Sequence, residues 1–86
     1  MDTEALVKLL LPAIETQLKT KDPRGTHEAY STLRNRGYSD KEAKKLLAAC
    51  LWKETQAVIQ SDAPFNPKRY QGFIDEMLAN SPAINP

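Results

Sequence analysis

The feature that most constrains the fold is the spacing of apolar residues, which recur every three or four positions through most of the chain. The first series consists of Leu6, Leu10, Ile14 and Leu18. A second regular series consists of Tyr70, Phe73, Ile74, Met77 and Leu78. Such spacing places the apolar side chains on one face of an α-helix, and no segment alternates as a half-buried strand would. The sequence therefore predicts an all-α fold.

Four main helices are expected, packed into a compact bundle. Their expected bounds are residues 3–19, 24–35, 40–60 and 67–79. Pro12 lies inside the first helix, where it removes one backbone donor and crowds the preceding turn, so we expect a kink or a break there. The third helix is the longest and carries apolar residues on more than one side. We therefore expect it to be central, covered by the first and fourth helices.

Local signals predict where several helices begin. Ser39 followed by Glu42 is a capping box, in which each side chain bonds the backbone N–H of the other residue. Asn66 and Asp22 are each followed by a proline, which is the pattern of an N-cap and a first helical residue. These signals place the starts of the third, fourth and second helices.

The length of the chain allows one hydrophobic core. With 86 residues, we expect a single helical domain over residues 1–80 and a flexible tail over 81–86, whose prolines cannot continue a helix. Apolar residues make up 41% and charged residues 27%, which is ordinary for a globular domain. A domain this small is expected to have a low free energy of unfolding. A homodimer, which would bury more surface, is therefore a possible form of the protein.

Charge and cysteine usage restrict the partners and the compartment. The net charge is +1, although residues 19–45 hold eight Lys or Arg against four Asp or Glu. This segment leaves nucleic-acid binding as a weak alternative, because a nucleic-acid domain usually carries a clear basic face. No leader peptide and no membrane span is expected. A single cysteine, Cys50, among leucines predicts a buried, reduced thiol and a cytoplasmic protein.

The third helix carries a second apolar series beside its main apolar face. Ala48, Trp52 and Ile59 lie well off the face formed by Leu47 and Leu51, and we call these three residues the flank stripe. One interpretation is that a neighbouring helix covers the flank stripe. The other is that the flank stripe is an exposed patch for a protein partner, since tryptophan is enriched at binding hot spots.

Glu54 is the unexpected residue of the main face, because it falls between Leu51 and Val58. A buried carboxylate needs a donor, so one interpretation is a structural hydrogen bond or ion pair. The alternative is a ligand or metal site that gathers inward polar side chains from several helices. Its candidate members are Glu15, Glu54, His27 and Arg34.

The constellations that carry catalysis are not found in the sequence. Its three glycines are scattered rather than grouped in a phosphate-binding loop, and Cys and His occur once each, too few for a usual zinc site. We therefore expect no catalytic residues, no cofactor, no metal and no enzyme activity. The leading hypothesis is an interaction or accessory module that binds an unknown protein partner or a second copy of itself.

Residues 14–54 carry a pattern that resembles a family of small bacterial helical domains of unknown function. The matching features are Ile14-Glu15-Thr16-Gln17-Leu18, the Asp22-Pro23 break, Leu33-Arg34, Gly37 and Glu42-Ala43. With the helical segment before them, they extend over residues 7–54. The resemblance implies the helical fold, and it implies no activity.

Other members of that family carry histidines in H-x-x-x-H spacing on the first and third helices, which implies a metal site in those members. This chain has Val7, Leu11, Lys41 and Lys45 at the positions that we align with those histidines. None of these side chains replaces imidazole as an ordinary metal ligand. The resemblance therefore implies the fold without the metal chemistry.

Overall fold

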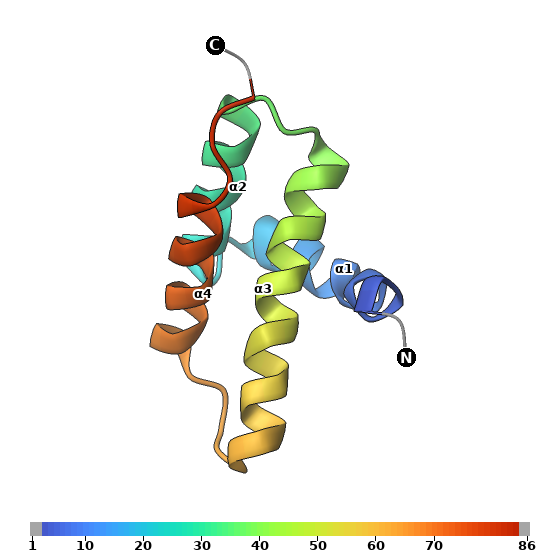
Figure 1. The fold of residues 1–86 in the computed structure, drawn as a ribbon, viewed down its shortest axis with the longest axis vertical. Helices are drawn as coiled ribbons and strands as arrows, with labels where there is room; N and C mark the ends of the chain where they lie inside the picture. The colour runs from blue at the N-terminus through green and yellow to red at the C-terminus, as the bar shows by residue number, and fades with distance from the viewer. Residues whose placement is uncertain (1–2, 85–86) are drawn as a thin grey trace.

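The computed structural model describes residues 3–84, and these residues form four α-helices without any strand (Figure 1). The helices are α1 (Thr3–Thr20), α2 (Arg24–Asn35), α3 (Asp40–Ser61) and α4 (Pro67–Ala79). The predicted all-α class is confirmed, and every predicted helix bound lies within one residue of the observed one. Over the same residues, no helix combines the length and the apolar character needed to cross a membrane.

Helix α3 is the centre of the bundle, as predicted, because α1, α2 and α4 all pack against it. Figure 1 shows α2 and α4 running along one side of α3, while α1 lies across it. The fully buried core comes from all four helices. Its largest apolar members are Ile14, Leu33, Leu47, Tyr70 and Ile74. Burying one such side chain stabilises the fold by about 1.5–3 kcal/mol, so the core accounts for the arrangement of the helices.

Helix α1 is continuous through Pro12, so the predicted possibility of a break is wrong. Proline removes only the hydrogen bond that the Lys8 carbonyl would accept, and both Lys8 and Pro12 are exposed. Water can therefore satisfy that carbonyl. Val7 and Ile14, one on each side of the proline, are buried in the core and hold the two halves of α1 in place.

Helix α2 begins at Arg24 as predicted, but its N-cap differs from the predicted residue by one position. Pro23, rather than Asp22, is the N-cap, and the Asp22-Pro23 peptide bond is cis. Pro23 has extended backbone angles, and its carbonyl accepts a hydrogen bond from the Thr26 N–H at 3.1 Å. Because proline has no side-chain acceptor, α2 begins without a side-chain cap.

The starts of α3 and α4 follow the predicted caps. The Glu42 N–H donates to the Ser39 hydroxyl at 3.1 Å, and the Ser39 N–H donates to the Glu42 carboxylate at 3.2 Å. Asn66 caps α4, and the ring of Phe65 meets that of Tyr70 edge-on at 5.5 Å. This Phe65–Tyr70 pair is a hydrophobic staple, which sets the direction in which the chain enters α4.

The segment after α4 packs back on the end of α2. The Arg36 guanidinium donates to the carbonyls of Leu78 and Ser81 at 2.7 and 2.9 Å, and the Ile84 N–H donates to the Arg36 carbonyl at 2.7 Å. Ser81 is buried. The predicted flexible tail is therefore attached to α2 as far as Ile84, and residues 85–86 lie outside the described residues.

Candidate interaction surface and polar clusters

The flank stripe is covered at one end and open at the other. Ala48 is fully buried, Trp52 is half-buried and Ile59 is 70% exposed. Trp52 and Ile59 are seven residues apart, which separates them by about 10 Å along the helix and only about 20° around it. The flank stripe is therefore buried within the fold at Ala48 and exposed to solvent at Ile59.

The position of α1 explains this division. Two ion pairs join α1 to the first half of α3: Lys44 to Glu15 and Lys45 to Glu4, both at 3.4 Å. They locate the crossing of α1 over α3 beside Ala48, which is packed in the core. Ile59 lies about 16 Å farther along α3, which exceeds the half-width of a helix, so α1 does not reach it.

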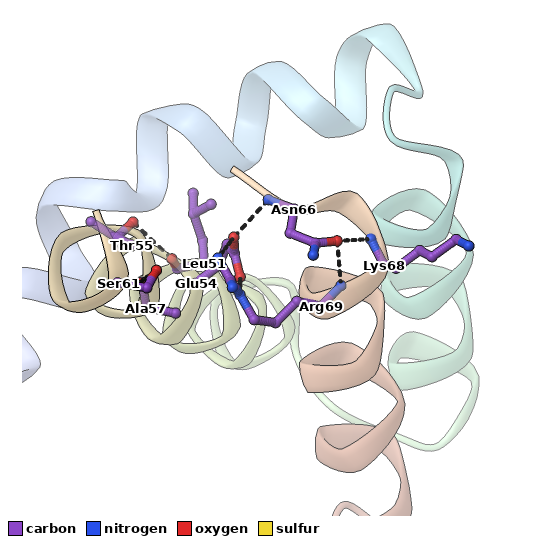
Figure 2. Close-up of polar contacts among 8 residues, drawn as sticks. All are labelled: Leu51, Glu54, Thr55, Ala57, Ser61, Asn66, Lys68 and Arg69. Carbon is purple, nitrogen blue, oxygen red and sulfur yellow. Dashed lines mark hydrogen bonds and ion pairs between the residues drawn. The ribbon is translucent and has the colours of Figure 1, made fainter. Parts of the chain in front are cut away.

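The open end of α3 is free of charged residues. Residues 55–61 contain none, although they include exposed positions on several sides of the helix. The Thr55 hydroxyl donates to the Leu51 carbonyl at 2.9 Å, within its own helix (Figure 2). Thr55 thus has its donor satisfied and can present its methyl group outward. Depletion of charge around exposed large apolar side chains is typical of the centre of a protein interface.

Glu54 is fully buried, and its partners are on α4 (Figure 2). Its Oε1 accepts from Arg69 Nε at 2.6 Å, and its Oε2 accepts from Arg69 Nη2 and from the Asn66 N–H, each at 2.8 Å. The Arg69 hydrogen bonds hold the pKa of Glu54 below its ordinary value, against the opposing effect of burial. Glu54 therefore joins α3 to the start of α4 as a structural ion pair.

Arg69 was not foreseen as the partner of Glu54. Fifteen residues separate the two in sequence, so helical spacing does not connect them. The signal that could have found it is the cap at Asn66. The loop between α3 and α4 is short, so the first turn of α4 must lie opposite the last turns of α3. A buried carboxylate at that level would face the N-terminus of α4 and its third residue, which is Arg69.

Glu15 and Arg34 belong to a different cluster, on the surface where α1, α2 and α3 meet. Lys44 bridges Glu15 at 3.4 Å and Asp40 at 3.2 Å. The Tyr30 hydroxyl donates to Asp40 at 2.6 Å and accepts from Arg34 at 3.1 Å. The Tyr30 hydrogen bond is the main reason that the pKa of Asp40 is lowered. Four members of this cluster line part of a shallow groove of about 340 Å³, namely Glu15, Tyr30, Asp40 and Lys44.

The predicted inward cluster is therefore not assembled. The buried Glu54 carboxylate accepts hydrogen bonds from Asn66, the N-cap of α4, and from Arg69. In contrast, the Glu15 side chain is 61% exposed and Arg34 is also exposed. His27 is half-buried, and no side-chain hydrogen bond or ion pair of His27 occurs within residues 3–84. Nor does that part of the chain contain three His, Cys, Asp or Glu side chains grouped to hold a metal ion. The sequence placed Glu15 inward because α1 is apolar on more than one side.

A buried polar cluster that the sequence did not indicate joins α1, α2 and α4. The Gln17 side-chain oxygen accepts from the Thr26 hydroxyl at 2.8 Å and from the Tyr70 hydroxyl at 3.0 Å. Thr26 and Tyr70 are almost completely buried. Because each hydroxyl has a partner, burying them carries no desolvation penalty for an unpaired group, and this cluster is structural.

Cys50 is buried beside α4, as predicted. Its thiol donates weakly to the Phe73 carbonyl at 3.5 Å, and burial raises its pKa to about 11. A thiol with this pKa is almost entirely protonated at neutral pH, so it behaves as a core residue rather than a nucleophile.

Comparison of the chain with protein-family models, with curated proteins and with solved structures finds no match.

Proposed function

We propose that this chain is a small helical interaction module, without catalytic activity of its own, that binds a protein through the open end of the flank stripe. The observation that carries the proposal is the division of the flank stripe. Ala48 is fully buried in the core, whereas Trp52 is half-buried and Ile59 is 70% exposed within residues 55–61, which carry no charge. A partner would cover Trp52 and Ile59 as the core covers Ala48.

The polar clusters support this proposal because their members already have partners within the fold. No buried side-chain nitrogen or oxygen in residues 3–84 is without a hydrogen bond. Glu54 holds α4, the Lys44 cluster holds the junction of α1, α2 and α3, and Gln17 joins α1 to α4. These side chains serve the architecture, which leaves the exposed apolar residues as the feature that the fold itself does not explain.

The proposal includes a bacterial and cytoplasmic setting. The bacterial setting rests on the resemblance of residues 7–54 to small bacterial helical domains, which is itself part of the proposal. A buried, unpaired Cys50 agrees with a reducing compartment.

Site-specific photocrosslinking in the cells that produce the protein tests this function. A photoreactive phenylalanine analogue is placed at position 59 in one variant and at position 9 in another. Leu9 is the matched control, since it is 72% exposed and lies on α1 rather than on α3. We expect a discrete protein adduct from position 59 and none from position 9. Equal labelling from both positions, or no adduct from position 59, would refute the proposed function.

A further inference from the structure

We infer that the protein covering the open end of the flank stripe is a second copy of this chain, in a dimer with two-fold symmetry. This inference rests on the proposed function, because it uses the same surface. In the dimer, the last turns of the two α3 helices lie antiparallel, and Ile59 of each protomer contacts Trp52 of the partner subunit.

The spacing of the flank stripe fits such a two-fold interface. A two-fold axis brings residue i against residue j of the other protomer, and j against i. An axis beside Thr55 and Gln56, midway between Trp52 and Ile59, would place each exposed isoleucine on the partner's half-buried tryptophan. Thr55 does not obstruct the contact, since its hydroxyl bonds the Leu51 carbonyl of its own helix. The order of residues along α3 therefore allows this surface to pair with a second copy of itself.

The distribution of charge also favours a second copy. In a two-fold interface, every charge near the axis meets the same charge on the other protomer, and like charges that face each other are strongly unfavourable. Residues 55–61 have no charge to repel. On the stripe side of α3, the nearest charge toward the N-terminus is Lys45, and Glu4 neutralises it at 3.4 Å. The charged residue that follows this surface is Asp62, the exposed C-cap of α3, and an axis beside residues 55 and 56 would not place it against its own copy.

The solvent-accessible area of the chain is larger than expected for a compact monomer, which is consistent with an interface on its surface. The chain exposes 5573 Å², whereas a compact monomer of its mass exposes about 5,100 Å². The surplus of about 450 Å² is more than half of the roughly 800 Å² that each partner buries in a stable interface. Figure 1 shows that the last turns of α3 extend past α1, with only the start of α4 and its loop alongside. The molecule measures 43 Å along its longest axis against 27 and 24 Å along the others.

Sedimentation equilibrium of the purified full chain tests the inference, with Trp52 fluorescence measured on the same samples. Over protein concentrations from about 1 to 500 µM, we expect the mass to approach twice the 9.7 kDa of one chain, with a blue shift of the emission as Trp52 becomes covered. Ile59→Glu should raise the dimer dissociation constant by at least about 100-fold, because two isoleucines lose their burial. Leu9→Glu, the matched control, should leave the dissociation constant within about two-fold.

Three outcomes would overturn the inference. These are a wild-type mass of one chain throughout this range, a dimer that Ile59→Glu leaves intact, and a dimer that Leu9→Glu weakens equally. Both substitutions are at exposed positions, so circular dichroism should show unchanged helix content in each variant. A monomeric wild-type protein that still crosslinks another protein from position 59 would refute the dimer alone. Absence of any adduct from position 59 would refute the proposed function.

Discussion

Replacing Glu54 with glutamine perturbs the ion pair that its buried carboxylate forms with Arg69. The carboxylate accepts three hydrogen bonds: Arg69 Nε on Oε1 at 2.6 Å, and Arg69 Nη2 and the Asn66 N–H on Oε2 at 2.8 Å. Glutamine has nearly the same shape but only one acceptor oxygen. With that oxygen in place of Oε2, its amino group would face Arg69 Nε, so that one donor would oppose another.

The expected loss of stability follows from this geometry. At least one charge-assisted hydrogen bond disappears, and the two that remain lose the charge of the acceptor. Hydrogen bonds to charged groups contribute about 1.5–3 kcal/mol each, so we expect Glu54→Gln to lower the free energy of unfolding by about 2–4 kcal/mol. A domain of 86 residues has a total of about 4–13 kcal/mol. The loss is therefore a large fraction of the total.

The effect should depend on pH in a definite direction. The pKa of Glu54 is lowered from its ordinary value of 4.5 in the folded protein, so the pair contributes its full stabilisation above that value. This contribution is lost as the pH falls through the lowered pKa. The difference between wild type and Glu54→Gln should thus be constant near neutral pH and shrink in acid. Asp40 and Glu42, whose pKa values are also lowered, act in both proteins and cancel from the difference.

Urea unfolding, followed by circular dichroism and Trp52 fluorescence between about pH 7 and pH 3, measures these quantities. Arg69→Met is the companion variant. It leaves the Glu54 carboxylate buried without its cation, so the pKa of Glu54 should rise above its ordinary value. That variant should gain stability as the pH falls from about 7 to 5, a range in which the Glu54 pair of the wild type contributes a constant amount. Equal stability of wild type and Glu54→Gln at neutral pH, or the wild-type pH trend in Arg69→Met, would refute the reasoning.

Two further substitutions and one measurement of thiol reactivity have definite expected outcomes. Ser39→Ala removes the acceptor of the α3 capping box and should lower the free energy of unfolding by about 1 kcal/mol in urea denaturation. Arg36→Ala removes both hydrogen bonds from the guanidinium to the segment after α4, so amide exchange at Ile84 should become faster. Arg34→Ala, at an exposed position of α2, should leave that exchange rate unchanged. Equal exchange rates at Ile84 in the two variants would contradict the attachment of this segment by Arg36. Cys50, with a thiol pKa of about 11, should react with Ellman's reagent far more slowly in the folded protein than in urea, and fast reaction without urea would show that the thiol is accessible.

The sequence alone determined the class and bounds of the helices, because these depend on neighbouring residues. The Ser39–Glu42 box and the Asn66 cap act within one turn, and an apolar residue every third or fourth position defines a face of its own helix. The one shifted cap, at Pro23 instead of Asp22, lies where the backbone turns between two helices. The continuity of α1 through Pro12 was likewise decided by packing, because core contacts on both sides hold the helix.

Only the tertiary structure decided the partners of the polar residues and the exposure of the flank stripe. A helical pattern shows that Glu54 points inward, but Arg69 faces it because α4 returns along α3. The same pattern places Ala48 and Ile59 on one line, yet one is buried and the other is 70% exposed. The physical reason is the finite width of α1. Helix α1 crosses α3 at one level, and the position of this crossing decides which residues of α3 are covered. The spacing of residues within α3 does not predict that position.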